Sequence, residues 1–271
     1  MSRLRRKPWA ASDMGISISG VEKRYVRRGR DTLALAGIDL EIENGEFVAF
    51  VGPSGCGKST LLNMIAGIVS PSGGRIVHDG RQIDGINTHV GYMTQMDSVL
   101  PWRTVDENIG LPLSFRDISA QDRRERVAAM LKAVDLDGFG GSFPNELSGG
   151  MRKRVALGQV LVYNPGTLLM DEPFGALDAQ LKLMMQKRLL DIWHETKKTV
   201  VFVTHDLAEA VTLAQRVVVF SGRPGSIKAI ERVSIPYPRD PFKVRFLAEF
   251  ETVYERLWSI LSPEIGKGED L

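Results

Sequence analysis

Cysteine and long apolar runs are what this sequence most clearly lacks. Its single cysteine, Cys56, excludes an internal disulfide and fits a reducing compartment. No apolar run approaches the roughly 18 residues that a membrane-spanning helix needs. The basic start, MSRLRRKPWAASD, has no apolar segment behind it, so we expect no secretory signal. Residues 1–15 are predicted to form a flexible tail, with contact to anionic lipid as the alternative.

An excess of charge of one sign is also missing. The formal net charge is +2 over 271 residues, which by itself gives no argument for binding nucleic acid. Hydrophobic residues make up 43% and charged residues 25% of the chain, as in ordinary globular proteins. The length therefore allows one large domain, or two modest lobes, with a buried core.

The pattern of apolar residues changes along the chain. Alternation and short apolar runs predict strands at residues 16–26, 33–42, 46–51, 75–78, 90–93, 167–170, 199–203 and 217–220. Helical spacing and turn signals predict helices at residues 59–69, 119–134 and 180–196. The second of these has a capping-box-like start, with Ser119 followed by Asp122. Because strands and helices alternate late in the chain, we expect a parallel sheet with right-handed crossovers. The strand-poor stretch at about 98–160 is predicted to be a helical subdomain.

The end of the chain, residues 238–271, is predicted to be an amphipathic helix followed by a tail. Its apolar residues at helical spacing are Phe242, Phe246, Phe250, Val253, Leu257 and Leu261. We expect this apolar face to pack on the body of the protein.

The stretch GPSGCGKST, residues 52–60, fits the phosphate-loop pattern G-x-x-x-x-G-K-[ST]. It follows a predicted buried strand and opens a predicted helix, which is the context that gives the pattern meaning. Its glycines let backbone N–H groups turn toward phosphate oxygens. We expect Lys58 to reach the β- and γ-phosphates and Ser59 to bind Mg²⁺. The alternative for this stretch is a chance glycine-rich turn. Cys56 is interpreted as a small spacer, with a redox role as the alternative.

Two acids, Asp171 and Glu172, follow the apolar run TLLM. Ligands of parallel sheets bind at this end of the strands, so we expect Asp171 to support Mg²⁺ and Glu172 to orient or deprotonate the attacking water. His205 also follows a predicted strand and is suited to bind the γ-phosphate and the water. Gln95 follows another and is suited to reach the metal or the water. An acidic turn and a structural histidine are the alternatives.

A second glycine-rich stretch, NELSGGMRKRV at residues 145–155, also opens a predicted helix, and helix N-termini attract anions. The chain contains, in this order, the phosphate loop, Gln95, LSGGM, the acids of LLMDE, GALD at residues 175–178 and His205. Together these motifs resemble the ATP-binding subunit of ABC transporters. The resemblance implies an α/β fold with a P-loop NTPase core at residues 16–237. That core would be a RecA-like mixed sheet flanked by helices, with an antiparallel β subdomain and the helical subdomain.

The resemblance implies ATP hydrolysis, with ATP and Mg²⁺ bound, and assigns roles to individual residues. The ATP-binding positions are Tyr25, Gly52, Pro53, Ser54, Gly55, Cys56, Gly57, Lys58, Ser59 and Thr60. The signature positions are Leu147, Ser148, Gly149, Gly150 and Met151. The catalytic positions are Glu172, His205 and Gln95, the D-loop position is Asp178, and the Mg²⁺ positions are Ser59, Gln95 and Asp171. Tyr25 matches the aromatic residue that stacks on adenine, although the sequence alone equally allows a strand-end core residue.

The resemblance also implies partners and explains the two glycine-rich stretches. Two subunits would pair head to tail, so that the signature residues of one cover the γ-phosphate bound by the other, and ATP would hold the homodimer closed. A separate membrane permease is implied, with a periplasmic solute-binding protein as an indirect partner and no nucleic acid. The subunit would then lie peripherally on the cytoplasmic face of the inner membrane. The apolar residues 99–102 (VLPW) favour permease docking, with anchoring of the helical subdomain as the alternative.

Three stretches, LPWRTVDEN, FGALDAQ and FSGRPGSI, resemble the nitrate, sulfonate and taurine branch of bacterial importers. They imply an energy-coupling subunit of an importer for such a small solute. Met151 and Lys153 stand where glutamine is frequent in the family. Neither departure removes a phosphate ligand, so the doubt concerns the contacts between the two subunits of the dimer. The alternatives are a soluble ABC ATPase that acts on nucleic acid or ribosomes, and a P-loop GTPase or kinase. One cassette, near-neutral charge and no NKxD motif count against them.

Overall fold

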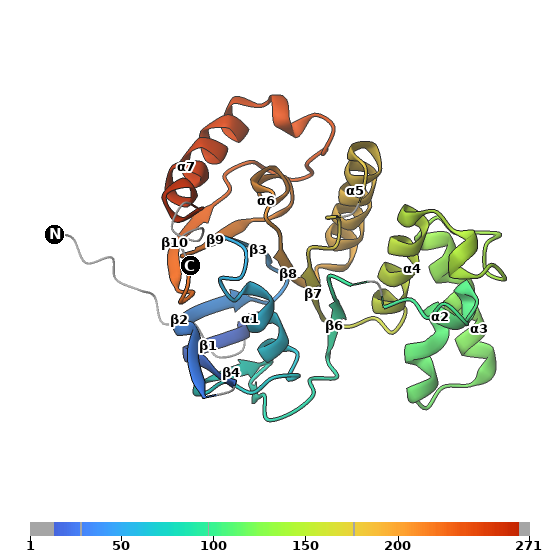
Figure 1. The fold of residues 1–271 in the computed structure, drawn as a ribbon. Helices are drawn as coiled ribbons and strands as arrows, with labels where there is room; N and C mark the ends of the chain where they lie inside the picture. The colour runs from blue at the N-terminus through green and yellow to red at the C-terminus, as the bar shows by residue number, and fades with distance from the viewer. Residues whose placement is uncertain (1–13, 28, 97, 176, 266–271) are drawn as a thin grey trace.

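The computed structural model describes residues 14–27, 29–96, 98–175 and 177–265 (Figure 1). Strand β1 begins at Met14, which is two residues inside the predicted tail, because Met14 still pairs with Glu43 of β2. The rest of the predicted tail lies outside the described residues.

The first sheet is antiparallel, with strand order β2-β1-β4-β5. Its strands are β1 (Met14–Arg27), β2 (Arg30–Glu43), β4 (Gly73–His78) and β5 (Arg81–Gln82). In β1, Ile16 and Ile18 are buried whereas Ser17 and Ser19 are partly exposed. This alternation is typical of a sheet with one solvated face, as the sequence predicted.

The second sheet is mixed, with strand order β10-β9-β3-β8-β7-β6. Its strands are β3 (Phe47–Val51), β6 (Val90–Met93), β7 (Thr167–Asp171), β8 (Thr199–Val203), β9 (Arg216–Phe220) and β10 (Ile227–Arg232). Five strands are parallel, and β10 runs antiparallel to β9 at one edge. In β3, Phe47, Ala49 and Val51 pack into one core cluster while Val48 and Phe50 pack into another, so both faces of the sheet are covered.

Helices cover the mixed sheet on two sides. Helix α1 (Lys58–Ile65) packs in the core shared with the antiparallel sheet, whereas α5 (Ala179–Thr196), α6 (Leu207–Leu213) and α7 (Ala248–Ile265) contribute to the core on the opposite face. The predicted α/β fold class, with its mixed sheet, antiparallel β part and helical part, is therefore confirmed. Within the described ranges, no helix combines the length and apolarity needed to cross a membrane.

The helical subdomain lies to one side of the sheets (Figure 1), and its buried apolar residues form a third core. It contains α2 (Val105–Gly110), η1 (Leu111–Phe115), α3 (Ala120–Ala133), η2 (Pro144–Glu146) and α4 (Gly149–Leu161). Ser119 caps α3, since its Oγ accepts a hydrogen bond from Asp122 N at 3.0 Å, as the sequence predicted.

Two helix predictions need correction. Helix α1 ends at Ile65 rather than near residue 69, because the chain turns at Gly67, where φ is +70° and a Cβ would collide with the carbonyl oxygen of Gly85. At the C-terminus, Phe242 and Phe246 are 45% and 86% exposed and precede α7, so their assignment to a buried helical face was wrong.

The cause of the second error is a turn before α7. The carbonyl oxygen of Asp240 accepts hydrogen bonds from Lys243 N and Val244 N, and its side chain accepts one from Phe242 N. The short helix η3 (Val244–Phe246) follows this turn. The helical path is then broken at Leu247, whose φ of −85° and ψ of 139° are extended. The remaining predicted apolar positions, Phe250, Val253, Leu257 and Leu261, are buried as expected.

Candidate active site

The phosphate-loop segment joins β3 to α1, as predicted. Gly57, the residue before the helix, has φ of +104°, and a Cβ there would lie 2.6 Å from Cδ2 of Leu35 on β2. Only glycine satisfies both requirements. Among the described residues, no side chain caps α1, so the N–H groups of its first turn are available to an anion.

The ammonium group of Lys58 lies inside this loop. The residue is 6% exposed, and its Nζ donates to the carbonyl oxygens of Gly52 at 2.8 Å and Pro53 at 2.9 Å. Its third contact is with Sγ of Cys56 at 3.6 Å, and sulfur is a weak acceptor. A phosphate oxygen would be a stronger partner for this third proton. Cys56 itself is fully buried, as a small spacer would be.

Asp171 ends β7 as a buried carboxylate. It is 5% exposed, and its Oδ1 has no hydrogen-bond partner among the described residues. Burial raises the pKa of Asp171 most strongly; the hydroxyl of Ser59 and the ammonium of Lys58 lower it, and the charge of Glu172 raises it further. A desolvated, unpaired carboxylate oxygen is costly unless a cation or donor satisfies it.

Glu172 brings three predicted catalytic residues together. Its Oε2 accepts a hydrogen bond from Nε2 of Gln95 at 3.1 Å and lies 3.3 Å from Nδ1 of His205. These residues follow β6, β7 and β8, which are adjacent parallel strands, so their carboxyl ends meet at one edge. Glu172 has φ of +47° while its N–H donates to the carbonyl oxygen of Val203 at 2.9 Å. The backbone thus holds a strained conformation that aims this side chain.

An ionic network that involves the residues on either side of His205 was not predicted from the sequence. Lys182 of α5 lies 3.1 Å from Oε1 of Glu209 and 3.4 Å from Oδ2 of Asp206, which caps α6. Burial alone would lower the pKa of Lys182, but the carboxylates of Glu209 and Asp206 raise it overall. Thr204 donates its hydroxyl to Glu209. The network ties the residues on either side of His205 to α5. The alternation of helix and strand gave no signal for it.

The signature stretch occupies the N-terminus of α4. Ser148 caps this helix, with its Oγ accepting from Met151 N at 3.3 Å, and a Cβ on Gly150 would collide with Leu181 of α5. Asp178 caps α5 in the same way, accepting from Leu181 N at 3.0 Å. In Figure 1, α4 lies apart from α1, so one chain does not bring its two glycine-rich stretches together.

Lys153 links the signature helix to the Gln95 loop. The residue is 5% exposed, and its Nζ donates to the carbonyl oxygen of Gln95 at 3.3 Å. Lysine at this family position, noted above as a departure, therefore joins two predicted parts of the site.

Tyr25 is not a core residue. It lies in β1 with 42% of its surface exposed, and Nζ of Lys23 lies 5.1 Å from the centre of its ring. The strand-end core alternative is wrong, and an exposed ring remains available for stacking.

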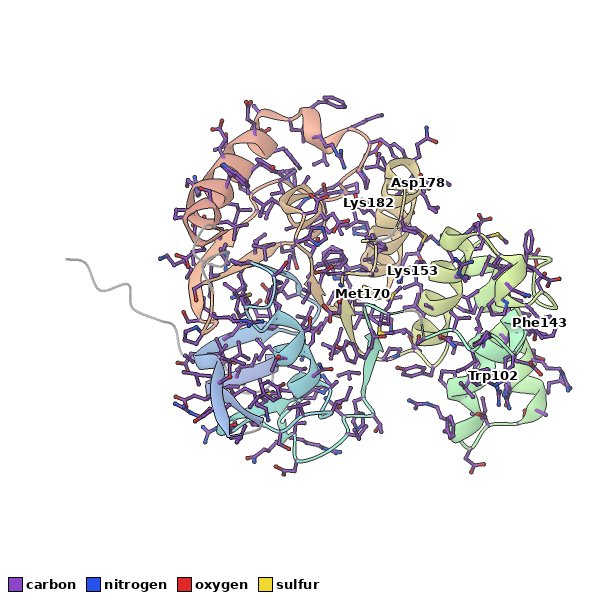
Figure 2. All side chains as sticks on the ribbon, in the orientation of Figure 1. Trp102, Phe143, Lys153, Met170, Asp178 and Lys182 are labelled. Atoms are coloured by element: carbon purple, nitrogen blue, oxygen red, sulfur yellow. The ribbon has the colours of Figure 1, made fainter. Side chains whose placement is uncertain are left out.

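The apolar stretch after Gln95 is only partly used inside the protein. Trp102 is 71% exposed and lies in the helical subdomain, away from Met170 of the sheet (Figure 2). Asn108 holds the loop instead: it is fully buried, accepts from Leu100 N, and donates to the carbonyl oxygens of Leu100, Arg103 and Thr104. Trp102 is therefore not a buried anchor, whereas its neighbour Val99 packs against two cores, as the anchoring alternative expects.

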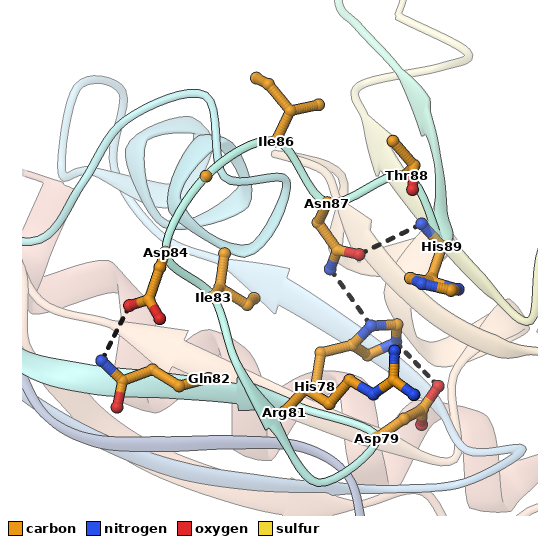
Figure 3. Close-up of a pocket in the computed structure, with 11 residues that line it drawn as sticks. His78, Asp79, Arg81, Gln82, Ile83, Asp84, Ile86, Asn87, Thr88 and His89 are labelled. Atoms are coloured by element: carbon orange, nitrogen blue, oxygen red, sulfur yellow. Dashed lines mark hydrogen bonds and ion pairs between the residues drawn. The ribbon is translucent and has the colours of Figure 1, made fainter. Parts of the chain in front are cut away.

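Two of the hollows formed by the described residues lie outside the predicted site. One, of about 640 Å³, lies between the sheet and the helical subdomain and is lined in part by Ile68, Ile86, Leu111 and Phe115. The other, of about 440 Å³, is formed by residues 78–89 and contains none of the predicted site residues (Figure 3). Its buried His78 is held by Thr167 and Asn87, and burial lowers its pKa.

Comparison with known proteins gives matches over most of the chain. The sequence profile of the ABC transporter family matches residues 35–175. An aliphatic sulfonates import ATP-binding protein of Bacillus cereus is 44% identical over 83% of this chain and 89% of its own length. An uncharacterized ABC transporter ATP-binding protein of Methanocaldococcus jannaschii is 41% identical over 93% of each chain. A solved dimeric ATP-binding cassette in a post-hydrolysis state, bound to ADP and Pi, gives a TM-score of 0.73 at 32% identity, covering 82% of this chain and all of its own.

Proposed function

This chain belongs to the ABC transporter family of ATP-binding proteins and is an ATPase coupled to transport. From that premise, we propose that it is the energy-coupling subunit of an importer in the nitrate, sulfonate and taurine branch. The observation that carries the proposal is the convergence of Gln95, Glu172 and His205 beside the phosphate loop, while the signature helix of the same chain lies elsewhere. The likeness to a sulfonate-import subunit supports the branch.

ATP binds, in this proposal, at Gly52–Thr60 with Tyr25 against adenine, and Mg²⁺ at Ser59, Gln95 and Asp171. The unpaired, buried Oδ1 of Asp171 fits a cation site, and the described residues contain no group of three His, Cys, Asp or Glu side chains that would form a cage. Mg²⁺ is usually held by few protein groups together with substrate phosphates. When bound there, it would neutralise charge on the phosphate oxygens.

Glu172 is the proposed general base. Its carboxylate is held from two sides, by Gln95 and His205, so that it can accept a proton from a water placed in line with the γ-phosphate. His205 donates to the phosphate or the water as charge develops, and Lys58 keeps a donor on the phosphates throughout. The protein contributes position and electrostatics, which is most of what phosphoryl transfer requires.

The working form is proposed to be a head-to-tail homodimer. Ser148 presents a hydroxyl and the first-turn N–H groups of α4 present donors, which together suit a γ-phosphate bound by a second copy. Relatives of this fold have been solved as dimers. Closure on ATP and loosening after hydrolysis would then convert chemistry into motion.

A membrane permease is the proposed partner, with the subunit peripheral on the cytoplasmic face of the inner membrane. Phe115, 84% exposed, lines the hollow between the sheet and the helical subdomain, and Trp102 of the same subdomain is 71% exposed. An apolar helix of the permease would cover these two side chains. Lys153 links α4 to Gln95 and so joins this surface to the site. A periplasmic solute-binding protein acts only through the permease.

Reconstitution tests this proposal. The subunit is co-expressed with the permease encoded beside its gene, placed in vesicles and assayed with the solute-binding protein, using alkanesulfonates, taurine or nitrate. We expect the loaded binding protein to stimulate ATP hydrolysis and solute uptake together. If the subunit hydrolyses ATP but neither binds the permease nor responds to it, the importer role is wrong.

A further inference from the structure

A loop of six residues, 221–226, joins β9 to β10 and lies against the phosphate loop. Gly225 donates its N–H to the carbonyl oxygen of Ala34 and accepts from Ala36 N, both at 2.9 Å, which forms an isolated bridge with β2. A Cβ on Gly225 would collide with the carbonyl oxygen of Cys56. The loop backbone is therefore wedged between β2 and the phosphate loop, with no room for a side chain at this position.

Arg223 of this loop makes a hydrogen bond to one peptide group of the phosphate loop. Its Nε donates to the carbonyl oxygen of Gly55 at 2.7 Å. A Cβ added to Gly55 would lie only 2.5 Å from Nη2 of Arg223. Gly55 has φ of +72°. The guanidinium thus occupies the space that a side chain at Gly55 would need, on an otherwise exposed part of the loop.

The geometry of a peptide unit gives this contact a consequence for ligand binding. The carbonyl of Gly55 and the N–H of Cys56 belong to one planar peptide and point in opposite directions. Because Arg223 holds the carbonyl outward, the Cys56 N–H faces the interior of the loop, where its contact with the carbonyl oxygen of Pro53 is long, at 3.4 Å. A cation on the carbonyl also polarises the N–H and strengthens it as a donor. Inward N–H groups of this kind are what a phosphate loop offers to its ligand.

Helix α7 anchors the same loop from the other side. Oε2 of Glu264 accepts from Gly222 N at 3.1 Å, and its Oε1 lies 3.2 Å from Nζ of Lys228 at the start of β10. The Glu264 side chain is only 5% exposed. One buried carboxylate therefore fixes residues on both sides of Arg223.

We propose that Arg223 is a positioning residue for the nucleotide phosphates, holding the Gly55–Cys56 peptide in its phosphate-binding orientation, and that Glu264 sets Arg223 from the C-terminal helix. The proposal deepens the proposed function, because it rests on the assignment of Gly52–Thr60 as the site of the ATP phosphates. The ligand class is the polyphosphate chain of a nucleoside di- or triphosphate.

Nucleotide affinity and turnover of Arg223→Ala test this role. A donor that acts equally in the ground state and the transition state changes KM without changing kcat. We expect KM for ATP, and the Kd for ADP measured by calorimetry, to rise about tenfold. We expect kcat at saturating ATP to stay within about twofold of the parent. Arg223→Lys should recover part of the ADP affinity, since an ammonium also donates to a carbonyl.

Two further variants separate positioning from packing. Arg256→Ala removes an arginine that joins α7 to β10 through Glu231, at 3.3 Å, without touching the phosphate loop, and should keep the parent KM. Glu264→Gln should raise KM by less than Arg223→Ala, and the double variant should show less than the product of the two effects.

The outcomes are distinct. If Arg223→Ala lowers the melting temperature but leaves KM and the Kd for ADP within about twofold of the parent, the contact is only packing and the proposal is overturned. An equal rise in KM for Arg256→Ala would overturn it as well. If the parent protein itself fails to bind ATP, the phosphate-loop assignment fails, and with it the proposed function.

Discussion

Nδ1 of His205 lies 3.3 Å from Oε2 of Glu172, the same oxygen that accepts a hydrogen bond from Gln95. Glu172 follows β7, the middle of three adjacent strands, and its Oε2 is contacted by residues that follow the two flanking strands, β6 and β8. Each neighbour has its own tether: Gln95 is linked through its carbonyl to Lys153 of α4, and the residues around His205 are linked through Lys182 to α5. Movement of α4 or α5 would therefore change the surroundings of the proposed base directly.

Replacing Glu172 with glutamine tests the base. Glu172→Gln keeps the size of the side chain but removes the charge that accepts a proton, so turnover should fall by about 10²–10⁴-fold. ATP affinity should stay near that of the parent, and the protein should accumulate as a dimer with ATP, measured by light scattering. Glu125→Gln, which removes an exposed carboxylate from α3, is the control. Turnover like that of the parent would show that Glu172 is not the base.

The signature serine allows a matched comparison between two helix caps. Ser148→Arg places a long cation where a second copy would bring its γ-phosphate, so the dimer should not close and cooperative hydrolysis should be lost. Nucleotide binding by the monomer should be unchanged, measured by fluorescent ADP titration. Ser119→Arg removes an equivalent cap from α3, each cap being worth about 1 kcal/mol, and should leave hydrolysis intact. Loss of monomer binding in Ser148→Arg would contradict action in trans.

The sequence predicts the fold well where patterns are local. The buried runs at β3, β7 and β8 and the serine cap of α3 lie where the sequence placed them. Strand β10 was not predicted, because it is an edge strand whose residues alternate only between partial and full exposure. Phe246 fits a helical period and still lies outside α7, because the backbone is extended at Leu247, between η3 and α7, and periodicity alone does not show this break.

In the candidate site, too, the sequence identified the residues with local motifs but not the contacts between distant segments. The sequence supplied Gln95, Glu172 and His205 as separate candidates, and their convergence on one oxygen follows from strand order. Arg223 and Glu264 carry no comparable signal, because their contacts join segments 168 and 42 positions apart in the chain. Such contacts are decided by how β10 and α7 return to the sheet.

Asp171 should show opposite effects on stability and activity. Burial raises the pKa of Asp171 in the folded protein above the ordinary carboxyl pKa. Protonation of Asp171 therefore favours the folded state. This stabilisation is fully present below the ordinary carboxyl pKa and is lost as pH rises through the raised pKa. At pH 7 without nucleotide or Mg²⁺, Asp171→Asn should therefore melt higher than the parent, by about 2–4 °C for each kcal/mol gained.

The same substitution should weaken the proposed Mg²⁺ site. Asp171→Asn should lower Mg²⁺-dependent hydrolysis by about 10–100-fold, as removal of a partner at a metal site does. The stability difference should shrink as pH falls below 4, where the parent carboxyl is protonated, and calorimetric melting across pH measures this. A variant that melts lower at every pH would mean that the charged carboxylate is stabilised by partners and is not an unpaired, desolvated group.

Trp102 should matter for the permease and not for the fold. The side chain is 71% exposed, so Trp102→Ala should change the free energy of unfolding by no more than about 0.5 kcal/mol. A buried aromatic anchor typically contributes 2 kcal/mol or more to an interface, so affinity for the permease should fall at least about thirtyfold, measured by co-purification and by binding to permease in nanodiscs. Trp258→Ala, on α7 and 49% exposed, is the matched control and should bind like the parent. ATP hydrolysis by the free subunit should be unchanged in both variants. If Trp102→Ala binds the permease normally while Trp258→Ala does not, the docking surface lies on the C-terminal helix and not beside the Gln95 loop.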